Sequence, residues 1–266
     1  ALQHHEVDCF LNDFDNIIPG YYDLVITDVL DNDTRPHDGL WVTFEDHGKA
    51  AYWADLVINA LYPPKPPSWR WQDTTAETGP DWAILRPEFH ALPPFEIREK
   101  ASRVLVMFGG TDPAGLHDLA KRSLLADTSS FNDLAAGRKS YVGDKWDVLF
   151  VGPGDSVPVA ATMRNHDILI TSAGRTVYEA AALGIPTIVL AQNNREATHV
   201  HLGPSHGNIY LGLGRLVTAE KLRHTVEQLA ADTELRRELS VTARRSVDGK
   251  GLDRIVHEID RLLEGL

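Results

Sequence analysis

The chain has 266 residues, of which 43% are hydrophobic and 24% are charged, and its formal net charge is −12 at pH 7. This composition is typical of a folded globular protein, and the length favours two domains over one. The negative charge argues against a general nucleic-acid-binding protein, and no apolar run approaches the roughly 20 residues that a membrane-spanning helix needs. Cys9 is the only cysteine, so an intrachain disulfide and a thiolate metal cage are excluded, which fits a cytoplasmic location.

Short apolar runs in the first part of the chain predict β-strands. These runs are Val7–Leu11, Asp23–Thr27, Leu40–Phe44 and Leu56–Ala60. Asp28 and the triplet that ends in His47 follow two of them, and Asn59 lies within the last, as expected of a parallel sheet with ligands at its strand tips. Residues 1–5 resemble the last turn of a helix, without the strand and loop that open a doubly wound domain. We therefore expect that the numbered chain starts partway into this domain.

Proline-rich stretches separate this region from the rest. The segment Tyr62–Pro67 predicts a stiff surface connection, and Ala91–Phe95 contains a second proline break. We place the domain boundary there, with an incomplete first domain at 1–94 and a second domain at 95–266 whose last helix packs back on the first.

The second half alternates strands and helices more regularly. Arg103–Phe108 and Val148–Val151 are predicted strands, Leu169–Leu190 forms a strand–helix–strand unit, and helical periodicity dominates from Ala219 onward. This alternation predicts an α/β fold with parallel sheets and right-handed crossovers.

The turn Thr171–Thr176, with the sequence TSAGRT, gives the strongest functional signal. Except for Arg175 its residues are small or hydroxylated, and they lie between a strand tip and a predicted helix start. The unpaired N–H groups and the dipole of such a helix attract an anion, and small residues leave room for phosphate. Glu179 lies one turn into this helix, where its carboxylate could bind a ribose diol or simply act as a capping acid. Both interpretations of Glu179 remain open.

Other loops follow predicted strands at the same edge of the sheet. Gly109 and Gly110 allow a sharp turn before Asp112, which we interpret as a helix N-cap followed by Pro113 at the first helical position. This loop has neither the Gly-Lys-Ser/Thr of a P-loop nor the GxGxxG spacing of dinucleotide sites. Gly152–Asp155 and the cluster Gln192–Asn194 end two further strands. Each loop alone is also explained as an ordinary connection, and only their shared edge favours a ligand site.

The histidines raise two further possibilities. His199, His201 and His206 are close in sequence, but no carboxylate or cysteine stands at ligand spacing with them, so we expect no metal site and no cofactor. His47 is a candidate base, and a polar strand end is the alternative.

Several segments together resemble a known family. The segments YDLVITD, WVTFEDHG, ADLVIN, WAILRPEF, VLVMFGGTDP, ILITSAGRTVYEAAALGIPTIVL, QNN and VDGKGLDRIV occur in the order found in the UDP-sugar hydrolases of pseudaminic acid biosynthesis. That family includes spore-coat polysaccharide proteins. More distantly, the chain resembles the GT-B glycosyltransferase that attaches N-acetylglucosamine during peptidoglycan synthesis. The resemblance covers residues from about Val7 to Leu263.

The resemblance implies two Rossmann-like domains in a GT-B-like fold, with UDP held mainly by the second. It places the uracil beside Gly152 and the ribose at Glu179. It implies Asn193 as a candidate catalytic residue and Asp28 and Asn194 as candidate sugar-binding residues. His47 is a candidate base from its place after a strand tip, although it matches a family position that is normally structural. The residues that would face the diphosphate are Gly109, Gly110, Thr111, Thr171, Ser172, Ala173, Gly174, Arg175 and Thr176.

The resemblance also implies a reaction. Water attacks the anomeric carbon of a UDP-linked deoxy-diacetamido sugar and releases UDP with inversion. The family's proposed base is a histidine in a loop after the first strand, a segment with no counterpart here, so we expect UDP binding with weak hydrolysis. The family's DHY-like triplet reads Asp28-Val29-Leu30. A GT-B glycosyltransferase and an inactive nucleotide-sugar-binding module remain alternatives. The expected partner is a UDP-sugar, without nucleic acid or membrane insertion.

Overall fold

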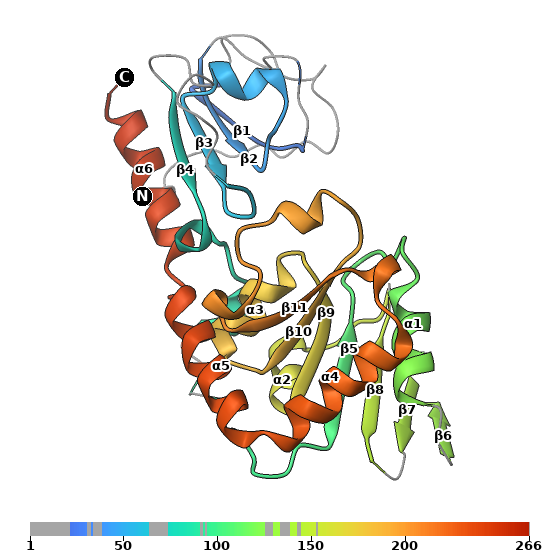
Figure 1. Cartoon of the computed structure of the whole chain (residues 1–266). Coiled ribbons are helices and arrows are strands. Elements are labelled where there is room, and N and C mark those ends of the chain that lie inside the picture. The colour runs from blue at the N-terminus through green and yellow to red at the C-terminus, as the bar shows by residue number, and fades with distance from the viewer. Residues whose placement is uncertain are drawn as a thin grey trace. The chain divides into compact units, whose positions relative to one another are not determined.

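The chain forms two compact units, which are described separately (Figure 1). The computed structural model describes residues 22–30, 33, 39–63, 74–90, 93, 95–125, 130–133, 139–142, 145–152 and 154–265. Unit 1 consists of Ala1–Ile84 and Lys250–Leu266, and unit 2 consists of Leu85–Gly249. The predicted strand Val7–Leu11, the helical turn before it and most of the proline-rich stretches lie outside the described residues. No helix among the described residues is long and apolar enough to cross a membrane.

Unit 1 contains a four-stranded sheet in the order β1-β2-β3-β4, with all neighbours parallel. Its strands are β1 (Leu24–Asp28), β2 (Leu40–Phe44), β3 (Leu56–Asn59) and β4 (Thr75–Thr78). The first three agree with the predicted runs to within a residue. The strand β4 was not predicted, because its sequence Thr-Ala-Glu-Thr lacks an apolar run and its side chains are only half-buried.

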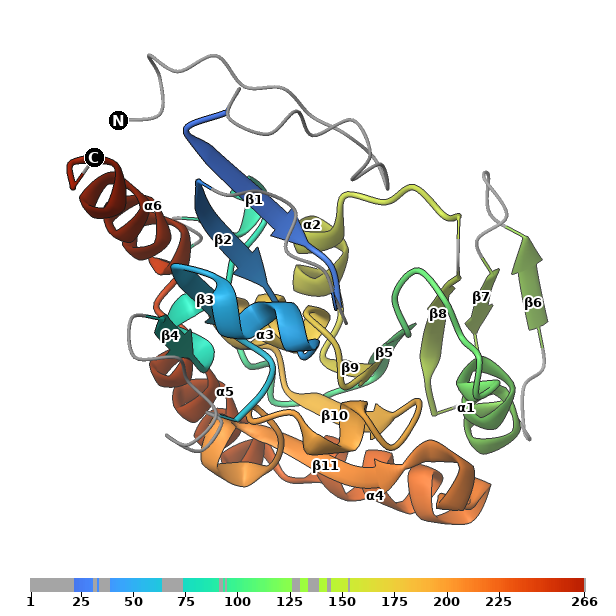
Figure 2. The ribbon, with the colours of Figure 1, turned by 90° about the horizontal axis from the view of Figure 1, so that it is seen from above.

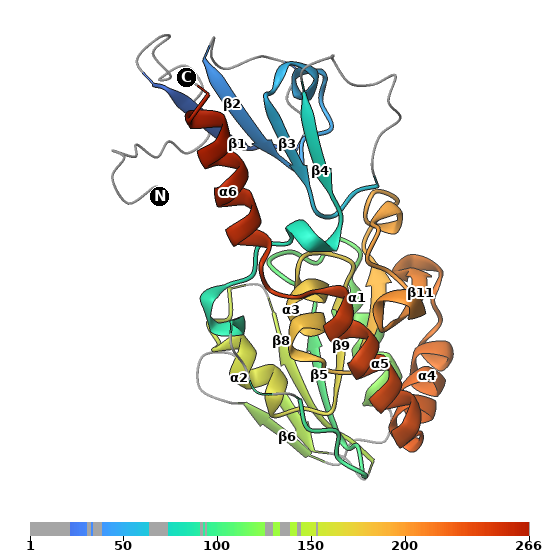
Figure 3. The same ribbon diagram turned by 90° about the vertical axis from the view of Figure 1, so that its left-hand side faces the viewer.

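Both faces of this sheet are covered. On one face, Ile255 and Ile259 of α6 (Gly251–Leu263) pack against a cluster that includes Leu56 and Ile58 (Figure 3). The helix starts close to the chain that follows β4, since a Cβ at Gly251 would lie 2.2 Å from the carbonyl oxygen of Ala83. The described part of unit 1 also contains the 3₁₀ helices η3 (Lys49–Trp53) and η5 (Pro80–Trp82). Ala51 of η3 belongs to the hydrophobic cluster on the opposite face of the sheet. The end of the chain thus supplies part of the core of unit 1.

Unit 2 contains a seven-stranded sheet in the order β11-β10-β9-β5-β8-β7-β6. Its strands are β5 (Arg103–Met107), β6 (Ser130–Asp133), β7 (Lys139–Val142), β8 (Asp147–Val151), β9 (Ile168–Ser172), β10 (Thr187–Ala191) and β11 (Asn208–Leu213). The strands from β11 to β8 are parallel, which confirms the predicted α/β class. The pairing of β6 with β7 and of β7 with β8 is antiparallel, and the sequence pattern predicted neither β6 nor β7.

Helices cover both faces of this sheet (Figure 2). On one face, α1 (Leu116–Leu124) and α4 (Ala219–Ala231) pack on residues such as Val104, Ile170 and Ile188. On the other, α3 (Thr176–Leu183) covers β10 and contacts α2 (Val159–Arg164) and α5 (Thr233–Ser246). Four 3₁₀ helices join these elements: η6 (Pro87–Phe89), η7 (Glu196–Thr198), η8 (Pro204–His206) and η9 (Gly214–Leu216).

The strand order reverses between β5 and β9. After β5 the chain passes through α1 to the strands on one side, and it then returns to place β9 on the other side of β5. In open α/β sheets, the carboxyl ends of the strands at such a topological switch point border the ligand-binding crevice. The loops after β5 and β9 therefore occupy the position at which a ligand of unit 2 is expected.

Candidate nucleotide-binding site

The turn after β9 is held by its buried residues and exposes only its later ones. Thr171, Ser172 and Ala173 are buried, whereas Gly174 and Thr176 are half-buried and Arg175 is exposed. The Ser172 hydroxyl donates to the carbonyl oxygen of Phe108 over 3.2 Å and ties the tip of β9 to the end of β5. The Thr171 Oγ1 atom is buried without a hydrogen-bond partner in the described part of the chain. A ligand would therefore meet Gly174–Thr176, which the earlier residues support.

The N-terminus of α3 has no side-chain cap. The helix begins at Thr176 after its N-cap residue Arg175, whose side chain makes no capping hydrogen bond. The backbone N–H groups of Gly174 and Thr176 donate to no acceptor among the residues that the structure describes. Uncapped N–H groups and the helix dipole together favour an anion at this end of a helix.

The loop after β10 fixes the start of the same turn. The Glu196 Oε2 atom accepts from the N–H of Gln192 over 2.8 Å and from that of Ala173 over 3.3 Å. Burial raises the pKa of Glu196 above its usual value, although these N–H groups act in the opposite direction. His199 Nδ1 donates to the Ala173 carbonyl oxygen over 2.6 Å. The N–H of Ala173, which was predicted to face the diphosphate, thus already has an acceptor.

Glu179 is paired with an arginine that the sequence analysis did not assign to the site. Arg86 Nε lies 2.6 Å from Glu179 Oε1, and Arg86 Nη2 lies 2.8 Å from Glu179 Oε2. The hydrogen bond and the charge of Glu179 raise the pKa of Arg86. Arg86 is in the WAILRPEF segment, but 93 residues separate the partners, so no local pattern could have indicated the pair.

The turn after β5 differs from the predicted N-cap arrangement. Gly109 has φ of 78°, a conformation that favours glycine, and both Gly110 and Thr111 are exposed. Asp112 and Pro113 were predicted as N-cap and first helical residue, but α1 begins only at Leu116. The chain forms a turn first, in which the N–H of Gly115 donates to the Asp112 carbonyl oxygen over 3.1 Å. The predicted helix start was therefore wrong by a few residues.

Asp112 nevertheless closes the N-terminus of α1. Its carboxylate accepts from the backbone N–H of Leu116 over 2.8 Å and from that of His117 over 2.9 Å. Burial favours the neutral acid, but the hydrogen bonds from His117, Gln192 and Leu116 outweigh it and lower the pKa of Asp112. The first amides of α1 are thus already occupied by a carboxylate.

Side chains also connect the loops after β5, β8 and β10. Gln192 donates to Asp112 Oδ1 and accepts from the N–H of Ala114, each over 3.0 Å. The His117 ring nitrogens lie 3.0 Å from Asp112 Oδ2 and 3.1 Å from the carbonyl oxygen of Val151. Gln192 is buried, and it was predicted only as a polar residue at a strand tip. This network holds the loops of the switch point together.

The remaining predicted residues of unit 2 lie on these loops. The N–H of Gly152 donates to Asp155 Oδ2 over 2.7 Å and closes the loop after β8. Asn193 and Asn194 are exposed after β10, and Asn193 Oδ1 accepts from the N–H of Glu196 over 3.0 Å. Asn193 Oδ1 therefore caps the first N–H group of η7.

Asp28 and His47 belong to unit 1. Asp28 ends β1 and is exposed. His47 follows the tip of β2, and its ring lies edge-on to that of Tyr62 with centroids 3.9 Å apart. The neighbouring Asp46 is buried and accepts from the Thr43 hydroxyl and from the N–H of Gly48, so it stabilises this strand end. His37, another histidine of this unit, lies outside the described residues.

The histidines near η7 pack behind the α3 turn. Burial lowers the pKa of His201 to about 3, so its ring is neutral at physiological pH. The ring is tilted by 39° against that of Tyr178, with ring centroids 4.2 Å apart. No group of three or more His, Cys, Asp or Glu residues suited to a metal ion occurs in the part of the chain that the structure describes.

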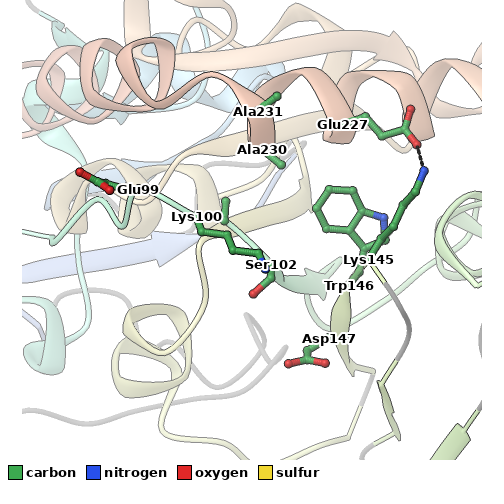
Figure 4. A pocket seen from close by; sticks show the side chains of 10 residues that line it. Glu99, Lys100, Ser102, Lys145, Trp146, Asp147, Glu227, Ala230 and Ala231 are labelled. Carbon is green, nitrogen blue, oxygen red and sulfur yellow. Dashed lines mark hydrogen bonds and ion pairs between the residues drawn. The ribbon is translucent and has the colours of Figure 1, made fainter.

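A separate pocket opens at the other edge of the unit 2 sheet (Figure 4). It has a volume of about 840 Å³ and lies beside Ser102 before β5 and Asp147 at the start of β8. Lys145 and Glu227 form an ion pair of 3.1 Å on its wall. Its position at the amino ends of the strands separates it from the switch-point loops.

Comparison with known proteins supports the fold and one part of the predicted resemblance. No family model matches the chain. The chain is 27% identical over 242 residues to the spore coat polysaccharide biosynthesis protein SpsG of Bacillus subtilis, covering 85% of this chain and 71% of SpsG. It is 27% identical over 207 residues to the uncharacterized protein MJ1062 of Methanocaldococcus jannaschii, covering 64% of this chain and 43% of that protein. The predicted similarity to spore-coat polysaccharide proteins is thereby confirmed.

Among solved structures, the chain is similar to MurG of Acinetobacter baumannii. The TM-score is 0.52 at 16% sequence identity, and the match covers 84% of this chain and 67% of MurG. The fold is therefore GT-B-like, as predicted, with Rossmann-like units built on parallel strands.

Proposed function

We propose that this chain is an enzyme of nucleotide-sugar metabolism that binds a UDP-sugar through unit 2. The observation that carries the proposal is the uncapped N-terminus of α3 at the topological switch point of the sheet. The diphosphate binds the N–H groups of Gly174 and Thr176, with Gly109–Thr111 across the crevice. The ribose binds Glu179, and the uracil lies beside the loop that begins at Gly152.

We further propose hydrolysis as the reaction. A water molecule attacks the anomeric carbon of a UDP-linked deoxy-diacetamido sugar, the bond from that carbon to the diphosphate oxygen breaks, and UDP leaves. Negative charge grows on the leaving diphosphate, so preorganised N–H groups at the start of α3 stabilise it more in the transition state than in the bound substrate. In this proposal Asn193 and Asn194 of unit 2 contact the sugar. Asp28 and His47 of unit 1 stay the candidate sugar-binding residue and the candidate base that the sequence predicts.

The similarity to the spore coat polysaccharide biosynthesis protein SpsG supports a role in the biosynthesis of a surface polysaccharide. A role in nonulosonic acid biosynthesis is proposed only from the resemblance to the UDP-sugar hydrolases. The resemblance to UDP-sugar hydrolases favours water as the acceptor. A glycosyltransferase of the same fold would pass the sugar to a hydroxyl group instead, and a binding module would release nothing.

Calorimetry and product analysis test this proposal. We expect UDP and inorganic pyrophosphate to bind, uridine to bind far more weakly, and free sugar and UDP to form slowly from a UDP-sugar without any acceptor. Sugar transfer that requires an added acceptor would identify a glycosyltransferase. UDP binding without turnover in either assay would identify a binding module, and failure of both UDP and pyrophosphate to bind would overturn the site itself.

A further inference from the structure

We propose that Arg86 is a positioning residue for ribose recognition, which fixes the Glu179 carboxylate so that the site selects ribonucleotides over 2′-deoxyribonucleotides. This inference rests on the proposed nucleotide site and goes beyond it, because it assigns the specificity for the sugar of the nucleotide to a pair of residues. Both residues belong to unit 2.

The contact between the two side chains leaves little rotational freedom to the carboxylate. The guanidinium donates one N–H to each oxygen, over 2.6 Å and 2.8 Å, in a parallel two-bond arrangement. Glu179 is buried in α3, with a side chain only 11% exposed. A flexible glutamate on a helix surface samples several rotamers, whereas this carboxylate is held by two bonds and by its surroundings.

The paired carboxylate still has acceptor capacity for a diol. An ionised carboxylate has about four lone-pair positions, and the arginine occupies one on each oxygen. The other position on each oxygen can accept a hydroxyl group, and vicinal hydroxyls present two donors side by side. The 2′- and 3′-hydroxyls of ribose match this arrangement, whereas a 2′-deoxyribose leaves one acceptor position unfilled. An unfilled acceptor in a partly dry site lowers affinity.

Arg86 is itself held by its own segment. Its Nη1 atom lies 3.5 Å from Glu88 Oε1, and its Cζ atom lies 5.5 Å from the ring centroid of the buried Phe89. The other Glu88 oxygen accepts from the N–H of Ala160 at the start of α2, over 3.3 Å. The segment around η6 therefore contacts both α2 and α3, and these contacts hold the backbone that carries the Arg86 guanidinium in place.

The charge of Arg86 also suits an anionic ligand. The chain has a formal net charge of −12, and a lone buried carboxylate beside a diphosphate would repel it. Arg86 balances the charge of Glu179 and leaves its hydrogen-bond geometry intact. A lysine could supply the charge but not the planar two-bond fork.

The test compares UDP, 2′-deoxy-UDP and pyrophosphate by calorimetry on the full chain. We expect the unmodified protein to prefer UDP over 2′-deoxy-UDP by about 10-fold or more, as for a hydrogen bond to a charged group. In Arg86→Lys, and more strongly in Arg86→Gln, this preference should fall to about threefold or less. The dissociation constant for pyrophosphate should stay within about twofold in Arg86→Lys, which keeps the positive charge, and should rise in Arg86→Gln, which does not. Glu179→Ala should remove the preference, and adding Arg86→Lys to it should change nothing more.

The outcomes separate this inference from the proposed function. A preference that persists unchanged in both Arg86 variants overturns the role of Arg86 while UDP binding stands. A protein that binds UDP without preferring it over the deoxynucleotide overturns the ribose role of Glu179 and Arg86 together. Absence of both UDP and pyrophosphate binding in the unmodified protein overturns the nucleotide site. Circular dichroism of Arg86→Lys checks that the variant is folded, and Glu179→Gln, which keeps the side-chain shape, provides the second variant.

Discussion

The helices α1 and α3 both start beside the switch point of the same sheet, yet a side chain caps the N-terminus of α1 and none in the described region caps that of α3. In α1 the Asp112 carboxylate accepts from the first amides, those of Leu116 and His117. In α3 the corresponding end has no side-chain cap, and small residues surround it. The first N–H groups of α1 already bind a carboxylate, so they are not available to an external anion. The difference therefore favours α3 over α1 as the proposed phosphate site and gives Asp112 a structural role at the start of α1.

The largest expected effect on anion binding comes from capping the N-terminus of α3 with a carboxylate, as Asp112 caps α1. A Cβ at Gly174 would meet only the Ser172 hydroxyl, at 4.0 Å, so Gly174→Asp fits the turn. Its carboxylate would reach the first amides of α3 and repel phosphate at short range, which should weaken pyrophosphate binding by about 100-fold. Gly110→Asp is the comparison variant, because a Cβ there meets nothing within 4 Å. It adds the same charge on the turn after β5 without capping α3, so it should weaken pyrophosphate binding much less than Gly174→Asp does. Equal dissociation constants for Gly174→Asp and the unmodified protein would contradict the assignment.

Removing the carboxylate that caps α1 should chiefly lower the free energy of unfolding. Asp112→Ala removes the cap of α1 and the bond from Gln192, which should lower the free energy of unfolding by about 2 kcal/mol at pH 7 in urea titrations. Because the folded protein lowers the pKa of Asp112, its contribution is complete above the unfolded value of about 4 and is lost as the pH falls through the folded value. The difference between variant and parent should therefore shrink in acid.

Asp118→Ala serves as the control for this stability experiment. Asp118 lies on the same helix, but its only recorded side-chain partner in the described region is Lys121, in an exposed pair. Its loss should cost less than about 0.5 kcal/mol. A stability loss for Asp112→Ala that is equally small, or that does not change with pH, would argue against the capping role.

A smaller effect should come from the carboxylate that already touches the α3 turn. Glu196 binds the N–H of Ala173, so its charge lies close to the proposed phosphate position. Glu196→Gln keeps an acceptor but removes the charge, and pyrophosphate affinity should rise about fivefold, since a unit charge several ångströms away costs about 1 kcal/mol at an effective dielectric constant of about 40. Glu227→Gln, at the pocket on the opposite edge of the sheet, should leave the affinity unchanged. Weaker binding in Glu196→Gln would show that this carboxylate supports the anion site.

The smallest effect is expected from removing divalent metal ions. If backbone N–H groups and the dipole of α3 neutralise the diphosphate, UDP binding should change by less than about twofold in EDTA. A large loss that added Mg²⁺ restores would move the phosphate site toward Asp112 or Asp155, the carboxylates of the neighbouring loops.

Local patterns were sufficient for most elements. Apolar runs predicted β1, β2 and β3 and the main strands of unit 2 to within about a residue, because burying both faces of a parallel strand requires such runs. The strands β6, β7 and β4 were missed, since their residues carry no comparable run, and β11 was not predicted either. The capping role of Asp112 was predicted from the sequence. The start of the helix at Leu116 was not, because a turn ending at Gly115 lies between Asp112 and the helix.

The sequence by itself determined the α/β class, the small-residue turn before α3 and the clustering of polar residues at strand tips, because each follows from the chemistry of a few neighbouring residues. Only the tertiary structure decided which tips flank the switch point, which helix start is closed by its own carboxylate and which cation pairs with Glu179. These features depend on strand order and on side chains far apart in the chain, such as Arg86 and Glu179, whose separation of 93 residues is bridged only when the sheet and its helices have packed.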